Sequence, residues 1–270
     1  MKYGMFLGQN AVDQFANDYN PGGGDGGGWA GILHGCVPDA RDLALAFSKM
    51  GYDCQCRFSG WNVAGKQIPW VMSGQCTAEE FIRVHKDWQA IAKPGDRFVI
   101  GNSGHGYQYD TPMQFNGGTG MCFYNRMMRD SEFHQLLVGW PAGVEVIYVL
   151  DTCYSGGLRE FFPMTPRVMP VVLKPEGEFQ RDMPKSSDIQ GSIVLLEAAQ
   201  QNQTAADGQY NGAFTGSVLD VLDQMWKQGI NPQVEWLFNG TKGLMATAFP
   251  KQTPNLTVLG NGASLLDGAL

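Results

Sequence analysis

Apolar and polar positions follow two periodicities along the chain, one typical of strands and one typical of helices. Five short apolar or alternating runs predict strands, and these are Tyr3–Leu7, Tyr52–Phe58, Arg97–Asn102, Val144–Leu150 and Ile193–Ala198. Apolar residues at helical spacing predict helices over Asp39–Met50, after the capping box that begins at Thr77, over Ser131–Val138, over Phe214–Gly229, and in a short segment that Pro232 opens. Strands that alternate with helices predict an α/β fold with a mainly parallel central sheet and helices on both faces.

One stretch interrupts this alternation and is the only plausible linker. Leu158–Gly191 contains five prolines and mixed charges between two predicted strands, and it is long for a connection inside a compact domain. We therefore expect this linker to be exposed. The 270 residues suffice for one α/β domain with a large core, so we interpret 1–270 as a single domain whose parts 1–157 and 192–270 flank the linker 158–191.

Charge and hydropathy narrow the classes of partner. The formal net charge is -7 and no run of like charges occurs, which argues against nucleic acid or an anionic membrane as the main partner and suits cationic substrates. The first apolar run is too short for a signal peptide, and none approaches the eighteen residues of a membrane helix. We therefore predict a cytoplasmic protein.

Neither a metal site nor a nucleotide site is indicated. The six cysteines include no Cys-x-x-Cys pair, and the four histidines complete no zinc pattern around them, so reduced thiols are the simplest interpretation. Cys54 and Cys56 alternate with polar neighbours and are expected to face the core. The glycine-rich stretch Pro21–Gly28 lacks the Gly-Lys-Ser/Thr ending of a phosphate loop and predicts a flexible connection.

The chemistry is expected in two glycine-flanked turns, each directly after a predicted strand. One holds His105 within Ser-Gly-His-Gly, and the other holds Cys153 within Asp-Thr-Cys-Tyr-Ser-Gly-Gly. Functional loops of an open parallel sheet emerge at the carboxyl ends of its strands. A thiolate nucleophile and an imidazole that exchanges protons near neutral pH are what acyl transfer needs. Taken separately, a buried core cysteine and a satisfied loop histidine remain the simpler interpretations.

The same segments resemble the caspases and metacaspases. RFVIGNSGHGYQ at 97–108 is similar to their histidine segment, and VIYVLDTCYSGG at 146–157 resembles the metacaspase nucleophile segment. Leu33–Ala40 resembles the metacaspase first-helix motif with Pro38 in place of the usual Asn. Leu196–Ala206, Gly212–Thr215 and Gln252–Pro254 also resemble segments of bacterial and lower-eukaryotic members. The resemblance covers nearly the whole chain and lies nearest to the bacterial metacaspase-like proteins, or orthocaspases.

The resemblance implies a caspase-like three-layer sandwich and a cysteine endopeptidase. Cys153 is then the nucleophile, His105 protonates the leaving amine, and the N–H groups of Cys153 and Gly106 form the oxyanion hole. The residues that match the family's primary pocket are Cys36, Asp39, Ser103 and Asp151.

The two aspartates of this set indicate specificity for arginine or lysine before the cut. Asp39 and Asp151 follow strand ends and are expected at one cleft, where an ion pair with a basic side chain would be shielded. Helix capping by Asp39, and loop organisation by Asp151, are the alternative interpretations. Caspases that select Asp use arginines instead, and we expect Arg41, the nearest one, on the solvated side of its helix.

Two regulatory features remain as hypotheses. The linker carries basic residues at which a basic-specific peptidase would cut itself, and these are Arg159, Arg167, Lys174, Arg181 and Lys185. Many metacaspases carry an acidic calcium site, but here only Asp130 and Glu160 remain as candidates, far below the six to eight oxygens that calcium prefers. We expect no required cofactor and weak or absent calcium dependence.

Two other functions stay open. One is a catalytically weak or inactive member that uses the fold as a binding or assembly module, and the other is a cysteine hydrolase that acts on another amide. The expected partner is a peptide or protein substrate with a basic residue at the cleavage site, and the expected oligomeric state is a monomer.

Overall fold

The computed structural model describes residues 1–59, 76–111, 114–153, 165–166, 188–199 and 203–270. For residues 108–111, 114–118 and 165–166 it describes the backbone alone.

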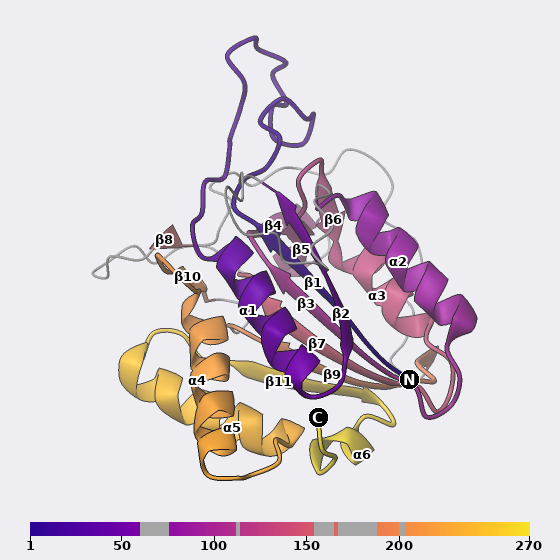
Figure 1. The fold of residues 1–270 in the computed structure, drawn as a ribbon. Coiled ribbons are helices and arrows are strands. Elements are labelled where there is room, and N and C mark those ends of the chain that lie inside the picture. The colour runs from indigo at the N-terminus through magenta and orange to yellow at the C-terminus, as the bar shows by residue number, and fades with distance from the viewer. Residues whose placement is uncertain (60–75, 112–113, 154–164, 167–187, 200–202) are drawn as a thin grey trace.

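A six-stranded sheet forms the centre of the molecule (Figure 1). Its strand order is β11-β9-β7-β3-β1-β2, and all neighbours run parallel except β11 against β9. The strands are β1 (Lys2–Gln9), β2 (Asp53–Ser59), β3 (Arg97–Ser103), β7 (Glu145–Asp151), β9 (Ser192–Glu197) and β11 (Asn255–Gly260). The five predicted strands are thus confirmed within a residue or two at their ends, because parallel strands buried on both faces carry strong apolar runs.

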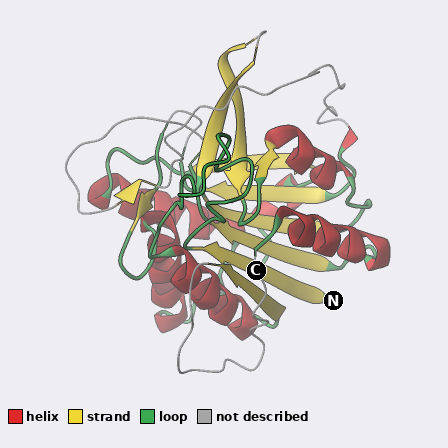
Figure 2. Ribbon diagram, turned by 90° about the horizontal axis from the view of Figure 1, so that it is seen from above, coloured by secondary structure: helices red, strands yellow, loops and turns green. Residues whose placement is uncertain are grey.

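Helices cover both faces of this sheet and make the fold a three-layer α/β sandwich, as predicted (Figure 2). One face carries α1 (Cys36–Lys49), α4 (Ala213–Lys227) and α5 (Val234–Ala248), and the other carries α2 (Ala78–Ile91) and α3 (Asp130–Val138). The short α6 (Ala263–Leu266) contacts β9. Each face has its own apolar cluster, centred on Phe6, Phe47 and Phe214 on the first and on Phe81, Phe98 and Trp140 on the second.

Two helices differ from the sequence-based prediction. α1 begins at Cys36, a turn before the predicted start at Asp39, because Pro38 is tolerated in a first turn whose N–H groups lack helical partners. α5 has 15 residues rather than the predicted short segment. Its buried positions Val234, Leu237, Phe238, Thr241 and Met245 keep helical spacing past two glycines, and tertiary packing outweighs the low propensity.

A second, three-stranded sheet was not predicted. It consists of β4 (Gly106–Thr111), β5 (Gln114–Cys122) and β6 (Met127–Arg129), which pair antiparallel in that order and follow His105 directly. β8 (Thr165–Pro166) and β10 (Ala206–Asp207) form a separate antiparallel pair of strands. The three-stranded sheet lies near the carboxyl ends of the central strands and so flanks the region where the two chemical turns emerge (Figure 1).

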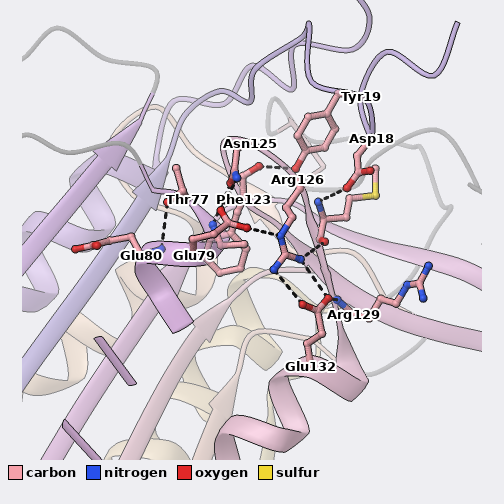
Figure 3. A network of polar contacts seen from close by, with 12 residues as sticks. Asp18, Tyr19, Thr77, Glu79, Glu80, Phe123, Asn125, Arg126, Arg129 and Glu132 are labelled. Carbon is pink, nitrogen blue, oxygen red and sulfur yellow. Dashed lines mark hydrogen bonds and ion pairs between the residues drawn. The ribbon is translucent and has the colours of Figure 1, made fainter. Parts of the chain in front are cut away.

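The turn between β5 and β6 is held by a set of ion pairs that we call the Arg126 network (Figure 3). The Arg126 guanidinium contacts the Glu79 carboxylate at the start of α2 and the Glu132 carboxylate in the first turn of α3, at 2.7 and 3.0 Å. On the same turn, the Phe123 carbonyl accepts a hydrogen bond from the Tyr19 hydroxyl at 2.5 Å. The Arg126 network therefore joins the β5–β6 turn to α2 and α3, and the Tyr19 hydrogen bond joins the same turn to the loop that precedes α1.

That preceding loop, residues 10–35, includes the glycine-rich stretch and is folded back on itself. The N–H of Gly28 donates to the Gln14 carbonyl at 2.7 Å, and that of Trp29 donates to the Tyr19 carbonyl at 3.0 Å. Gly23 and Gly27 have φ of +61° and +72°, a region that favours glycine. The glycines therefore serve tight turns in this loop, whereas the sequence predicted only a flexible connection.

Among the described residues, no helix is both long enough and apolar enough to cross a membrane.

Candidate active site

The two predicted catalytic residues stand at matched positions on adjacent strands. β3 and β7 pair in parallel, and their last paired residues are Ser103 and Asp151. His105 and Cys153 each follow two residues after this pair. The sequence spacing did not reveal whether these strands were neighbours, and the sheet order shows that they are.

The backbones of the two turns touch at Gly106. A Cβ atom on Gly106 would lie 1.3 Å from the carbonyl oxygen of Cys153 and 3.2 Å from its Cα, so no side chain fits there. The N–H of Gly104 also donates to the carbonyl of Asp151 at 3.3 Å. The two turns therefore form one continuous surface, with the N–H groups of Gly106 and Cys153 in the same neighbourhood.

The imidazole of His105 is held by a carbonyl and an aromatic ring from the loop before α1. Its Nε2 lies 3.1 Å from the carbonyl oxygen of Gly31, and its ring centre lies 4.5 Å from that of Trp29 in an edge contact. A carbonyl oxygen only accepts, so Nε2 carries the proton in the neutral ring and Nδ1 is the basic nitrogen. The side chain is almost fully buried, with 4% of its surface exposed.

The thiol of Cys153 is buried beneath the segment that leads into β10. The N–H of Ala205 donates to Sγ at 2.6 Å. Gln252 fixes this segment, because its side chain accepts from the N–H of Ala206 at 3.0 Å and donates to the carbonyl of Ala198 at 2.9 Å. An N–H directed at sulfur favours negative charge on it, which suits a nucleophile.

The predicted pocket aspartates lie at the N-terminus of α4. Asp39 accepts from the Ser103 hydroxyl at 2.6 Å and from the N–H of Gly212 at 2.9 Å. Asp151 accepts from the N–H and the hydroxyl of Thr215 at 3.0 and 2.7 Å. Both carboxylates are buried, and both face the positive end of the α4 dipole. Asp39 does not cap its own helix, whose N-cap is Gly35.

Cys36 completes the predicted set from the first position of α1. Its carbonyl packs against Gly8, where a Cβ atom would lie 2.2 Å away, and Gly8 pairs with Ser103 across β1 and β3. The structure therefore places Cys36 at the level of the strand ends that carry Ser103 and Asp151. All residues of the predicted site lie at this one edge of the sheet.

A third buried aspartate was not predicted. Asp207 accepts from the N–H groups of His34 and Gly35 at 2.8 and 2.9 Å, and so fixes the two residues that lead into α1. Together with Trp29, Gly31, Ala205 and Gln252, it approaches the site from segments far away in sequence. The resemblance had drawn attention to the segments of Ala205 and Gln252, but not to what they contact.

Burial disfavours the thiolate form of four other cysteines. All six are buried thiols. Burial raises the pKa of Cys54 to about 11 and that of Cys56 to about 12, and raises the pKa values of Cys76 and Cys122 as well. The prediction that Cys54 and Cys56 face the core is confirmed, since 5% and 0% of their surfaces are exposed.

The candidate calcium ligands are not brought together by what the structure describes. In the described residues, no three His, Cys, Asp or Glu side chains gather as a metal site. Asp130 accepts from the N–H groups of Thr119 and Ser131 at 3.2 and 2.7 Å, while Glu160 lies outside the described residues.

Comparison with known proteins identifies the family. Residues 16–261 match the model of the caspase domain of the C14 peptidases. The chain belongs to the caspase domain family. Its relatives include metacaspase-1 of Schizosaccharomyces pombe, at 23% identity over 285 residues, covering 83% of this chain and 63% of that protein's length. This caspase-domain chain thus spans less than two thirds of that relative.

Two solved structures resemble this caspase domain. Protein GSU0716 of Geobacter sulfurreducens superposes with a TM-score of 0.74 at 26% identity, covering 99% of this chain and 97% of that one. Caspase-1 of Spodoptera frugiperda superposes with a TM-score of 0.57 at 9% identity, covering 96% and 86%. The latter likeness concerns the fold alone.

Proposed function

We propose that this caspase-domain protein is a cysteine endopeptidase that cleaves peptide bonds after arginine or lysine. The observation that carries the proposal is the matched position of His105 and Cys153, each two residues beyond the paired residues Ser103 and Asp151. The membership of the chain in a cysteine peptidase family supports it.

The proposed reaction begins with the thiol. Nδ1 of His105 takes the proton of Cys153, and the thiolate attacks the carbonyl carbon of the scissile bond. The N–H groups of Cys153 and Gly106 stabilise the oxyanion that forms. The imidazolium then gives its proton to the leaving amine, the C–N bond breaks, and a thioester remains for water to hydrolyse. The Gly31 carbonyl on Nε2 supports this role, since it leaves Nδ1 as the atom that exchanges the proton.

The proposed specificity rests on the buried carboxylates. Asp39 and Asp151 place two acidic groups beside Cys36 and Ser103 at the edge where the nucleophile emerges. An ion pair with a guanidinium or ammonium group is strengthened where water is excluded, so a basic side chain gains most from such a pocket.

A panel of fluorogenic peptides tests this function. We expect cleavage of peptides with Arg or Lys before the cut, at least about 100-fold faster than of Asp peptides, because only a basic side chain pairs with the carboxylates. Cys153→Ala should abolish it, and Cys54→Ala, a buried thiol outside the site, should leave it intact.

The other outcomes decide between the open alternatives. Cleavage of simple amides in preference to peptides would indicate another kind of hydrolase. No cleavage of any substrate, together with no labelling of Cys153 by an arginyl chloromethylketone, would indicate a non-catalytic module and contradict the proposal.

The remaining expectations stay predictions. They are a monomeric enzyme, no required cofactor, and weak or absent stimulation by calcium, which an activity titration with calcium against chelator would test.

A further inference from the structure

Trp29 contacts the proposed acid–base residue directly. Its ring centre lies 4.5 Å from that of His105, with the ring planes inclined at 60°. Two residues further on, Gly31 gives its carbonyl to Nε2 of His105. Gly31 has φ of +54°, and a Cβ atom there would lie 3.0 Å from the Trp29 ring and 3.1 Å from the His105 ring. The segment 29–31 therefore contacts the imidazole twice, through the Trp29 ring and through the Gly31 carbonyl.

The segment 29–31 is itself held by contacts that lead to the β5–β6 turn. Trp29 packs against Tyr19 with ring centres 5.9 Å apart, and its N–H donates to the Tyr19 carbonyl. The Tyr19 hydroxyl donates to the Phe123 carbonyl, and Asp18 accepts from the N–H of Met127 at 2.7 Å (Figure 3). The Arg126 network fixes the same turn to α2 and α3. Trp29 is thus connected, through Tyr19 and the β5–β6 turn, to α2 and α3 and not only to its own loop.

The backbone of His105 is tied to this same sheet. Its carbonyl accepts from the N–H of Cys122 at 2.9 Å, and Cys122 belongs to the apolar cluster of Val12, Tyr19, Tyr107 and Met127 against which Trp29 packs. The three-stranded sheet and the residues packed against it therefore position both the backbone and the ring of His105. Trp29 itself is only half-buried.

We propose that Trp29 is a positioning residue that holds the His105 imidazole in the plane from which Nδ1 protonates the leaving amine. The inference rests on the proposed peptidase function. The Gly31 hydrogen bond fixes one ring nitrogen but leaves the ring free to rotate about that bond. The indole blocks this rotation, because an edge contact between two rings restricts their relative orientation.

Nδ1 serves two steps: it takes the proton of Cys153, which both substrates need, and it gives that proton to the nitrogen of the leaving amine as the C–N bond breaks. An amine is a poor leaving group without this proton, whereas the thiolate of a thioester substrate leaves as an anion and needs none. Loss of ring positioning should therefore slow amide cleavage more than thioester cleavage.

The experiment compares one acyl group presented as a coumarinyl amide and as a benzyl thioester. For Trp29→Ala we expect kcat/KM of the amide to fall about 30-fold, within the range of general acid catalysis, with kcat carrying most of the loss. The thioester, which needs only the thiolate, should fall by a clearly smaller factor. Trp29→Phe, which keeps a ring, should recover most of the amide activity. Trp236→Ala, which removes an exposed tryptophan of α5, is the control.

Equal losses on amide and thioester would overturn the inference, because a general loosening of the site affects both. So would unchanged amide cleavage in Trp29→Ala. A second readout does not need activity: the ring proton signals of His105, assigned by their absence in His105→Gln, should move in Trp29→Ala and largely return in Trp29→Phe. If the wild type cleaves neither substrate, the proposed function fails, and unchanged His105 signals would overturn the positioning role separately.

Discussion

Three buried aspartates surround the proposed cleft, and they differ in what their carboxylate oxygens contact. Asp207 uses both oxygens to accept from the backbone N–H groups of His34 and Gly35, just before α1. Asp39 divides its oxygens between one N–H group and the Ser103 hydroxyl, which can turn to accept instead. Asp151 receives both of its Thr215 bonds on Oδ2. An amide keeps one accepting oxygen, which is enough for the Thr215 bonds of Asp151 and for the Gly212 bond of Asp39, but not for the two N–H groups at Asp207.

Asparagine variants separate the role of charge from that of shape. In Asp39→Asn and Asp151→Asn we expect kcat/KM for Arg peptides to fall about 10- to 100-fold, because each loses a charge-assisted pair with the substrate. Their melting temperatures should fall less than that of Asp207→Asn. Asp207→Asn is the matched control: it should lower the free energy of unfolding by about 1–2 kcal/mol and keep the preference for arginine. If all three variants lost stability alike and none lost selectivity, the pocket assignment would be wrong.

At the scale of elements, α2 is joined to the sheet by a buried polar chain. His85 of α2 contacts the Tyr148 hydroxyl of β7 through Nε2 at 3.1 Å, and its Nδ1 lies 2.8 Å from the Phe81 carbonyl. Trp140 donates to the same hydroxyl at 2.9 Å. Burial lowers the pKa of His85 to about 4, so the imidazole stays neutral in the folded protein where it would be charged in the unfolded chain.

This depressed pKa predicts a loss of stability in mild acid. The unfolded chain takes up a proton at His85 below about pH 6.5 and the folded protein only near pH 4, so stability is full above 6.5 and declines as the pH falls through that window. Between pH 7.5 and 5 we expect this group to cost about 2 kcal/mol. Urea titrations of wild type and His85→Gln, which keeps an acceptor for Tyr148, would measure it. Parallel pH profiles for the two proteins would contradict the assignment.

What the sequence predicted at this scale follows from local pattern. The central strands and most helices have apolar periodicity that survives in the fold, and the Thr77 cap is present, with its hydroxyl accepting from the N–H of Glu80 at 3.2 Å. The β4–β5–β6 sheet escaped prediction because its glycines and methionines give no clear alternation. β11 escaped because its residues Asn255–Gly260 are only partly buried and carry no continuous apolar run.

The sequence predicted the reactive residues of the site but not the residues that contact them from distant segments. His105 and Cys153 stand in turns with a distinctive local sequence. Trp29 and Gly31 lie 76 and 74 positions before His105, and nothing near them in the sequence indicates that contact. Such contacts arise only when loops from separate strands meet at the sheet edge.

At the scale of the whole molecule, the central sheet contains strands from both sides of the predicted linker. β7 lies before the linker and β9 after it, yet they pair along their full length. The apolar cluster on one face likewise includes residues from both parts of the chain, among them Phe47 and Phe214. The parts 1–157 and 192–270 therefore share the central sheet and an apolar cluster.

This arrangement shapes the prediction of self-cleavage. The five basic linker residues Arg159, Arg167, Lys174, Arg181 and Lys185 lie outside the described residues, and cutting at one of them stays a hypothesis. We expect wild-type protein to yield two fragments by denaturing mass spectrometry that still elute together from a sizing column, because the sheet joins them. Cys153→Ala should remain intact, and identical intact masses for both proteins after incubation would refute the hypothesis.

The pairing of Ser103 with Asp151 has a consequence for how this chain tolerates changes in loop length. His105 and Cys153 each lie two residues beyond this pair, so their separation does not depend on how much chain lies between the two strands. Loops that contact neither reactive side chain can therefore change length while His105 and Cys153 keep their spacing, whereas a single residue added between the paired residues and either side chain displaces that side chain.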